Sequence, residues 1–396
     1  MQVRRCAHVM IEPRERLDFD LALLATGGTG LRNVIEWIAL APHRDTEVVL
    51  SLDEVAVLGA LSPEQWLRLD DLAQSHPRPV LEALLEKQLL VAQAGDDTSA
   101  RDADQALRDA HWRGLDAIAH RYSRWHGVDT VEAQRRFGEE TDQTFLQRLG
   151  DAPTHVRERV PAAQRQALSA AGTSALDALL ARRVTCRNYD LSQNLSFADF
   201  STAMYRAFGA RAVDEYAPGI FLQKKGAPSA GSLHPVEAYV LVQRVDGIVS
   251  GLYHYHSAAH ALEPIREMNP DKLTALAKVC LGGQPYFAEA HVVIALAGRF
   301  ERNFWKYRNH AKAYRAVILD AGHLSQTLYL AVTELGLGAF VTAGVNEVEI
   351  EQAFGLEPMA EGPLAMCGFG IRGSQRNEVE FDPNHAVWPT DSRNPA

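Results

Sequence analysis

The chain has 396 residues, of which 46% are hydrophobic and 23% are charged, and its formal net charge is −10. At about 150 residues per domain, this length predicts two or three domains with a sizeable core. The composition excludes a disordered chain, a disulfide-stabilised miniprotein and a fibrous repeat. The acidic balance disfavours sequence-independent binding to nucleic acid, which needs a basic surface.

The four cysteines are far apart and form no CxxC pair. That spacing is typical of a reducing compartment and disfavours both a zinc site and a disulfide framework. The sequence has no apolar run of the roughly 18 residues that span a membrane, and its N-terminus lacks the apolar core of a signal peptide. We therefore expect a cytoplasmic protein with no metal, no membrane segment and no nucleic-acid partner.

The N-terminal region, predicted as a domain over residues 1–155, contains one compact pattern at about 45–95. There a short strand precedes a helix that starts at the Ser62 cap, and an amphipathic helix and a second short strand follow Pro77. Helix, helix and strand at this scale predict a winged-helix-like domain. A further amphipathic helix is predicted over 105–125.

A proline-containing, charged stretch separates this region from a second domain, predicted over 165–390. Helices are predicted at 174–183, 197–208, 271–280, 310–335 and 347–354. Strands are predicted at 236–245, 252–256, 291–297, 339–345 and 364–371. The alternation predicts an α+β fold in which helices cover a mixed sheet. The long helix at 310–335 is apolar on several faces, so we expect it to be buried.

The first candidate site is the basic segment after the helix at 174–183. Arg183, Thr185 and Arg187 alternate along it, and alternate residues of an extended segment face the same side. Two guanidinium groups and a hydroxyl on one side suit a phosphate group. A solvated basic stretch is the alternative interpretation.

The second candidate is the loop Gly226–Pro235, which precedes a predicted strand. Its two glycines and two prolines indicate a tight loop that exposes backbone N–H groups and the Ser229 hydroxyl, with Gly231 at its centre. Such a loop suits a planar ligand. An ordinary connecting loop remains the alternative.

The third candidate is the pair Lys306 and Tyr307. The pair lies in the segment 299–315, which holds six Lys or Arg residues and one acidic residue. A lysine at the edge of an apolar site loses solvation, which lowers its pKa towards that of a base, and a neighbouring tyrosine can relay a proton. A surface lysine lying over an aromatic ring is the alternative.

The fourth candidate is a set of glycine turns near the C-terminal end. Gly336 and Gly338 follow the long helix, and Arg372 follows the last predicted strand. Glycines let the backbone approach a ligand closely, and the arginine suits a phosphate contact. Turn geometry at the ends of helices and strands is the alternative.

Three other patterns carry no site prediction. Gly27–Gly30 lacks the ending of a P-loop and follows no strand. His254 and His256 share a strand face, with no carboxylate or cysteine at ligand spacing. Cys186 lies between cationic side chains, but no base accompanies it in the sequence.

Taken in order, these segments resemble one family. The flavin-phosphate motif of nitroreductase-fold proteins, usually written RRSxR, resembles the segment RRVTCRNY. SagB-type dehydrogenases carry blocks similar to APSAGSLHPVEAYVLVQRVDGIVSGLYHYHSAAHAL and FERNFWKYRNHAKAYRAVILDAGHLSQTLYLAVTELGLGAF. The resemblance covers residues from about 180 to 372, close to half of the chain.

The resemblance implies a nitroreductase-like α/β sandwich that forms an intertwined homodimer with FMN at the subunit interface. SagB-type members mature ribosomally made peptides by oxidising thiazolines and oxazolines to thiazoles and oxazoles. The implied partners are a precursor peptide, a second copy of the chain, and a cyclodehydratase or other maturation proteins.

The resemblance also assigns residues. The implied cofactor-binding residues are Arg183, Thr185, Arg187, Ser229, Gly231, Gly336, Gly338 and Arg372. Lys306 and Tyr307 match the Lys–Tyr pair that the family uses for catalysis. Thr185 keeps the hydroxyl of the usual serine, whereas Val184 replaces a second arginine and His234 stands where a tyrosine is common.

Three hypotheses about function follow. The first is FMN-dependent dehydrogenation of azolines in a peptide, with Lys306, helped by Tyr307, as the base and N5 of FMN as the hydride acceptor. The second is an NAD(P)H-dependent nitroreductase or ene-reductase that acts on a small molecule. The third is a non-catalytic scaffold that binds a peptide.

Overall fold

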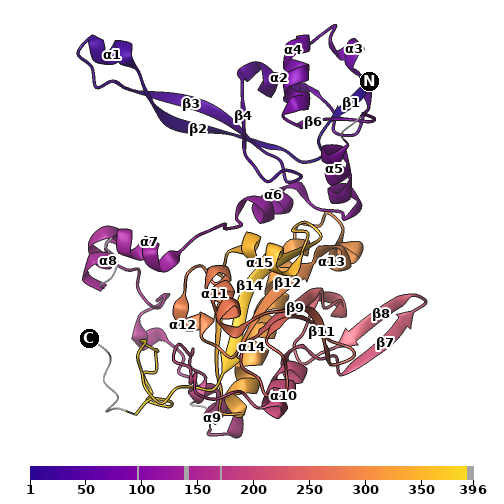
Figure 1. Ribbon diagram of the computed structural model, residues 1–396. Coiled ribbons are helices and arrows are strands. Elements are labelled where there is room, and N and C mark those ends of the chain that lie inside the picture. The colour runs from indigo at the N-terminus through magenta and orange to yellow at the C-terminus, as the bar shows by residue number, and fades with distance from the viewer. Residues whose placement is uncertain (96–97, 138–141, 170–171, 390–396) are drawn as a thin grey trace. The chain divides into compact units, whose positions relative to one another are not determined.

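The computed structural model describes residues 1–95, 98–137, 142–169 and 172–389 (Figure 1). These residues form two compact units. The first unit comprises Met1–Arg124, Arg299–Val317 and Glu357–Glu361, and the second comprises the remaining described residues. Each unit contains both helices and strands, so the predicted α+β class is confirmed.

The first unit has two three-stranded sheets, in the orders β5-β1-β6 and β2-β3-β4. Their bounds are β1 (Gln2–Arg5), β2 (Met10–Phe19), β3 (Leu31–Leu40), β4 (Val48–Leu50), β5 (Leu67–Arg68) and β6 (Leu90–Ala92). β2 and β3 form a long antiparallel hairpin that carries α1 (Leu21–Ala25) at its far end (Figure 1). The hairpin was not predicted, because most of β2 is exposed and its sequence shows no apolar alternation.

The helices of the first unit pack around buried apolar side chains. Their bounds are α2 (Leu52–Ala60), α3 (Leu69–Leu72), α4 (Arg78–Glu86), α5 (Ser99–Asp109), α6 (Gly114–Tyr122) and α13 (Phe300–Tyr307). Val3, Leu58, Leu81 and Leu90 join β1, α2, α4 and β6 in one buried cluster. The predicted helix after Pro77 and the two short strands are therefore confirmed, and the winged-helix-like character of this part stays a prediction.

The helix predicted to start at Ser62 is wrong. The Ser62 hydroxyl accepts hydrogen bonds from the N–H groups of Glu64 at 3.1 Å and Gln65 at 3.3 Å, as a cap would. No helix follows, because the chain extends into β5 and Leu67 pairs with Val3 of β1. The pairing competes with the local helix signal, and the next helix starts only at Leu69.

The single helix predicted over 105–125 is also wrong. The structure has α5 and α6 instead, and they are separated at His111, whose φ is +59°. Trp112 follows the break and is buried against Phe300 and Phe304, with its indole N–H donating to the Met359 carbonyl oxygen at 2.8 Å. Burial of this large ring outweighs continuation of the helix.

His120 of α6 makes the stability of the first unit depend on pH. Its Nε2–H donates to the Pro358 carbonyl oxygen at 2.9 Å and its Nδ1 accepts from the Tyr314 hydroxyl at 3.0 Å, so the buried ring is neutral. Burial lowers the pKa of His120 to about 4. His120 therefore binds a proton near pH 6.5 in the unfolded chain but only near pH 4 in the folded chain. The free energy of unfolding consequently falls as the pH drops from 6.5 towards 4.

We expect His120→Gln to remove this pH dependence. Between pH 7 and pH 5 the histidine lowers the free energy of unfolding by about 2 kcal/mol, and the variant lacks that contribution. Urea unfolding at the two pH values measures the difference. His155→Gln is the matched control, because His155 is exposed. An unchanged pH dependence in His120→Gln would contradict the assignment.

The second unit is built on a six-stranded sheet with the order β11-β10-β9-β12-β14-β13. Its strands are β9 (Val236–Val242), β10 (Gly251–His256), β11 (Ala261–Glu267), β12 (Val292–Arg299), β13 (Gly338–Thr342) and β14 (Glu361–Gly370), and a separate hairpin pairs β7 (Ala212–Ala217) with β8 (Ile220–Lys224). The five predicted strands of this part are thus confirmed.

The second unit has helices on both faces of this sheet and others that lie apart from it (Figure 1). They are α7 (Thr130–Arg136), α8 (Asp142–Leu149), η1 (Ala162–Gln164), α9 (Ala175–Arg182), α10 (Phe197–Phe208), η2 (Ala230–Ser232), α11 (Pro270–Cys280), α12 (Pro285–Ala288), α14 (Ala313–Glu334) and α15 (Glu347–Phe354). Leu273 of α11, Phe287 of α12 and Ile350 of α15 join Leu241 of β9 in one core on one face. On the opposite face, α10 places Phe200 against Phe369 of β14.

The five helices predicted in this part are confirmed, including α14, but α14 is not buried on every side. Val317, Leu324 and Leu328 are buried, whereas Ile318 and Leu319 are 46% and 59% exposed. The sequence shows that the surface of this helix is apolar, but it does not show whether other residues of the same chain cover that surface. Among the described residues, no helix has the length and apolar character needed to cross a membrane.

Candidate functional site

The predicted phosphate-binding segment begins where α9 ends and runs beside β13. The Cys186 N–H donates to the carbonyl oxygen of Ala339 at 2.8 Å, and Thr185 pairs with the same residue in a parallel bridge. Cys186 is buried, whereas Arg183, Thr185 and Arg187 are partly exposed. Neighbouring residues of an extended segment face opposite sides, so the three polar side chains share the open one.

Two of these side chains meet Tyr329 of α14. The hydroxyl oxygens of Thr185 and Tyr329 are 3.0 Å apart, and the Arg183 guanidinium carbon lies 5.3 Å from the centre of the tyrosine ring. Burial raises the pKa of Tyr329, so its hydroxyl keeps its proton at neutral pH. Tyr329 was not predicted as a site residue, because nothing in an apolar helix pattern marks one aromatic residue as polar in function.

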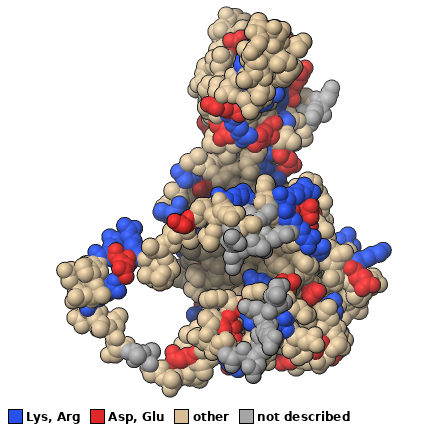
Figure 2. Space-filling model, turned by 90° about the vertical axis from the view of Figure 1, so that its left-hand side faces the viewer, with Lys and Arg blue, Asp and Glu red and all other residues tan. Residues whose placement is uncertain are grey.

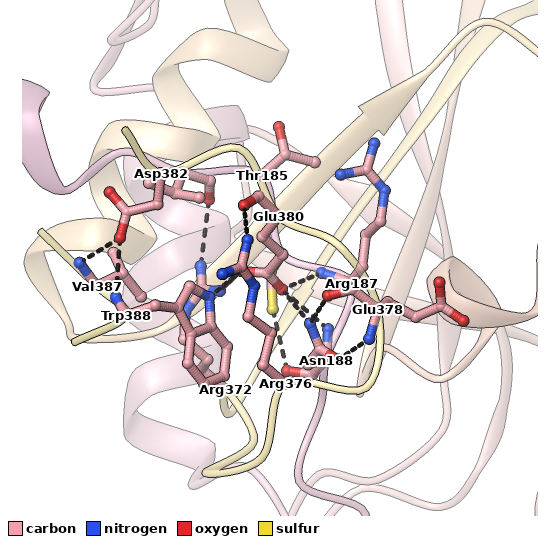
Figure 3. A network of polar contacts seen from close by, with 12 residues as sticks. Thr185, Arg187, Asn188, Arg372, Arg376, Glu378, Glu380, Asp382, Val387 and Trp388 are labelled. Carbon is pink, nitrogen blue, oxygen red and sulfur yellow. Dashed lines mark hydrogen bonds and ion pairs between the residues drawn. The ribbon is translucent and has the colours of Figure 1, made fainter. Parts of the chain in front are cut away.

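Arg187 leans towards α12. Its Nη1 donates to the Val379 carbonyl oxygen at 3.1 Å, and its guanidinium carbon lies 5.6 Å from the ring centre of Phe287 and 5.7 Å from that of Tyr286. Figure 3 shows the side chains of Thr185 and Arg187 on the same side of the segment. Arg187 is therefore held in place by aromatic rings and by the C-terminal chain.

The C-terminal chain folds back onto this segment through the buried carboxylate of Glu380 (Figure 3). Its Oε1 accepts from the backbone N–H groups of Arg187 at 2.6 Å and Asn188 at 3.1 Å, and from the Asn188 side chain at 2.9 Å. Its Oε2 accepts from Nη1 of Arg372 and from the Trp388 indole at 2.8 Å. One carboxylate thus fixes the backbone that carries Arg187.

Arg372, predicted as a phosphate partner, is engaged inside the protein. Besides the ion pair with Glu380, its Nη2 donates to the Val184 carbonyl oxygen at 3.2 Å. These contacts tie the end of β14 to the arginine segment, and a phosphate role for Arg372 stays a prediction. Sequence reasoning missed Glu380 and Asn188, because the order of residues does not reveal that the C-terminal chain returns to this segment.

Ser229 and Gly231 lie in the loop that leads into β9. Gly231 has a φ of +62°, a conformation that favours glycine. The Ser229 hydroxyl donates to a carboxylate oxygen of Asp320 in α14 at 2.5 Å. Asp320, a fourth residue that the sequence did not predict, therefore anchors the predicted flavin loop.

Gly336 and Gly338, both predicted to bind the cofactor, have different structural roles. Gly336 has a φ of +76°, and its N–H donates to the Thr333 carbonyl oxygen at 3.1 Å in the turn that ends α14. A Cβ atom on Gly338 would lie 2.5 Å from the Cys186 sulfur. Gly338 thus lets β13 approach the arginine segment, and contact of either glycine with a cofactor stays a prediction.

We expect Gly338→Ala to lower the free energy of unfolding by about 2 kcal/mol, because the new methyl group overpacks against the buried Cys186. Gly336→Ala is the matched variant: it has free space for a Cβ and meets only the cost of its positive φ, about 1 kcal/mol. Urea unfolding of both variants measures the two effects. Wild-type stability in Gly338→Ala would refute the close approach.

The predicted catalytic pair belongs to the first unit. Lys306 and Tyr307 end α13, which Phe300 and Phe304 anchor in the core. Lys306 is exposed, Tyr307 is partly buried, and the lysine Nζ lies 5.6 Å from the centre of the tyrosine ring. This placement agrees with the alternative interpretation, a surface lysine lying over an aromatic ring. The catalytic role of the pair stays a prediction.

The structure shows the surroundings of Cys186 and His254, which belong to two of the patterns that carried no site prediction. Burial raises the pKa of Cys186 to about 12, so this thiol stays protonated and is a poor nucleophile. Strand pairing brings Glu237 and Glu263 to His254, at 3.5 Å and 2.7 Å, which spacing along the chain did not reveal. Nevertheless, the described part of the chain holds no group of three or more His, Cys, Asp and Glu side chains arranged as metal ligands.

The surface charges are mixed in sign. On the face that Figure 2 shows, Lys and Arg residues alternate with Asp and Glu residues over the described surface. Binding to duplex nucleic acid uses a continuous basic surface, and this face does not have that character.

Comparison with known proteins finds a family match that covers much of the second unit and also the first-unit segments Arg299–Val317 and Glu357–Glu361. A model of the nitroreductase family matches residues 180–371. The putative nitroreductase MJ1384 of Methanocaldococcus jannaschii is 30% identical over 195 residues, which cover 49% of this chain and 90% of that protein.

Two peptide-processing proteins are also similar. The trifolitoxin-processing protein TfxB of Rhizobium leguminosarum bv. trifolii is 34% identical over 45% of this chain and 46% of its own length. The microcin B17-processing protein McbC of Escherichia coli is 26% identical over 46% of this chain and 66% of its own length. The match thus spans about half of TfxB and just under two thirds of McbC.

The identity and coverage of MJ1384, together with the matched family model, decide the assignment. They confirm the nitroreductase-like fold and the family resemblance seen in the sequence. The chain belongs to the nitroreductase family.

Proposed function

We propose that this chain is an FMN-dependent dehydrogenase that acts in the maturation of a ribosomally made peptide and oxidises azoline rings to azoles. The observation that carries the proposal is the partly exposed face formed by Arg183, Thr185 and Arg187 in a nitroreductase-family chain. The names of TfxB and McbC, both processing proteins of peptides, support a peptide substrate.

The residues fit the charge and shape of FMN. The alternation of Arg183, Thr185 and Arg187 along an extended segment places two guanidinium groups and a hydroxyl on one side, as a phosphate dianion requires. The loop around Gly231 offers backbone donors to a flat ring system. Bound FMN would supply the hydride acceptor for the reaction. Arg372 already pairs with Glu380, so we assign the phosphate mainly to Arg183, Thr185 and Arg187.

The chain's own residues would handle the proton. Oxidising an azoline to an azole removes two hydrogens, one as a proton and one as a hydride. In our proposal the Lys306 amine takes the proton from the ring carbon, and Tyr307 holds the amine in position. Because Lys306 is exposed, the bound peptide must displace water from it before it can act as a base.

We propose a homodimer as the working form. Ile318 and Leu319 are exposed side by side on α14, and a second copy of the chain would cover them. We further propose a peptide-handling region over residues 1–155 with a winged-helix-like part, a flavin domain from 165 onward, and a cyclodehydratase or another maturation protein as partner. Four free buried cysteines support a cytoplasmic location.

A second candidate is an NAD(P)H-dependent reductase of small molecules. The observation that favours it is the match to MJ1384, a putative nitroreductase of which 90% is covered. Anaerobic mixing of the FMN-loaded protein with an azoline-containing peptide or with NADPH separates the two functions. The proposal expects the peptide to bleach the visible absorption of the flavin. Bleaching by NADPH alone would favour the reductase, and a protein that binds a peptide but no FMN would support the scaffold.

A further inference from the structure

We propose that Asp320 is the positioning residue of the flavin loop and that the loop binds the flavin ring through the Gly231 N–H rather than through the Ser229 hydroxyl. The inference rests on the proposed FMN-dependent function. It concerns the chain's own loop 226–235 and α14, both of which belong to the second unit.

The Ser229 hydroxyl is committed to two partners. Its proton is donated to Asp320 at 2.5 Å, and its oxygen accepts from the backbone N–H of His234 at 2.9 Å. Asp320 is 4% exposed, so the bond lies away from bulk water and keeps most of its strength. A hydroxyl that donates to a buried carboxylate has no second proton for a flavin.

Asp320 holds more of the loop than Ser229. The backbone amide of Ala230 and the charges of Lys225 and His323 also favour the ionised form of its carboxylate. Burial acts in the opposite direction and raises the pKa of Asp320. Lys225 is itself 3% exposed, so a cation accompanies the carboxylate beneath the loop.

The loop needs such an anchor because its backbone is unusual. Gly231, Ser232 and His234 have φ values of +62°, +55° and +46°, and the last two are not glycines. A non-glycine residue in this region costs about 1 kcal/mol or more, and surrounding contacts must hold it there. The chain of bonds from Asp320 through Ser229 to His234 closes the loop across these residues.

The same bonds leave the Gly231 amide free for a ligand. The N–H groups of Ser232 and His234 donate to Ser229, and that of Leu233 donates to the Ala230 carbonyl oxygen. Among the described N–H groups of residues 231–234, the one at Gly231 has no hydrogen-bond acceptor in the protein. A glycine at this position also leaves room for a flat ring beside the backbone. Asp320 therefore acts through the loop to hold the Gly231 N–H in place as a donor for the flavin.

FMN titrations of Asp320→Asn, Ser229→Ala and the double variant test the inference. We expect each single variant to weaken FMN binding about tenfold, which is about 1.4 kcal/mol, and to shift the visible spectrum of the bound flavin. The double variant should bind no more weakly than the singles, because both act through one hydrogen bond. Asp271→Asn, an exposed carboxylate in the first turn of α11, is the matched control.

The melting temperatures of the flavin-free variants separate positioning from a general structural role. Positioning lowers the stabilisation that FMN confers, whereas a structural role lowers the melting temperature with and without FMN alike. Wild-type FMN affinity and spectrum in Ser229→Ala and Asp320→Asn, or strictly additive losses, would overturn the inference. If the wild-type protein binds no FMN, the proposed function itself fails.

Discussion

Glu380→Gln is expected to destabilise the second unit by about 3 kcal/mol and to reduce the amount of FMN that the protein retains. The carboxylate is fully buried and accepts five hydrogen bonds, two of them from the backbone of Arg187 and Asn188. Glutamine removes the negative charge beside Arg372 and places an NH₂ group against donors. Urea unfolding gives the stability, and the flavin-to-protein absorbance ratio gives the retention.

Glu378→Gln is the control for that variant, because the Glu378 side chain is exposed and lies two residues away on the same segment. It makes the same change of charge and is expected to alter stability by less than about 0.5 kcal/mol. Equal stability of the two variants would mean that the C-terminal chain does not hold the arginine segment. A destabilised Glu380→Gln protein that still retains all its FMN would confine Glu380 to a structural role.

Lys306→Ala is expected to lower the turnover of an azoline peptide by about 10²- to 10⁴-fold, because the proposed reaction loses its general base. The proposed FMN-binding residues belong to the second unit, so the variant should keep its yellow colour. Single-turnover oxidation of the peptide measures the effect. Tyr307→Phe should give a smaller loss, because the lysine still accepts the proton.

Lys312→Ala provides the comparison for this experiment. Lys312 is exposed and belongs to the same basic segment, so the variant makes the same charge change without removing the proposed base. We expect it to keep near wild-type turnover. Loss of FMN from Lys306→Ala would make the lysine a cofactor ligand, and equal rates in the two variants would rule out Lys306 as the base.

Local patterns in the sequence predicted much of the second unit. The apolar run at 292–297 became the central strand β12, and the Ser196 cap correctly marked the start of α10. These signals were reliable because burial and capping act over a few residues. The helix predicted at Ser62 failed for the opposite reason, since pairing with Val3 overrode a valid local cap.

The residues that hold the candidate site were harder to predict. Arg183, Thr185 and Arg187 were found because their alternation is a local signal. Glu380 lies 193 residues along the chain from Arg187, whose backbone N–H donates a hydrogen bond to its carboxylate. Asp320 lies 91 residues from Ser229. A single carboxylate in a polar tail or on an amphipathic helix looks like any other, and only the fold identifies its partner.

The intact mass of the azoline-bearing precursor peptide, measured with and without this protein and FMN, tests the central claim most directly. Oxidation of each ring removes two hydrogens, so the account predicts a loss of two hydrogens per modified ring. A gain of two hydrogens in the presence of NADPH, or an unchanged mass with fully FMN-loaded protein, would contradict it.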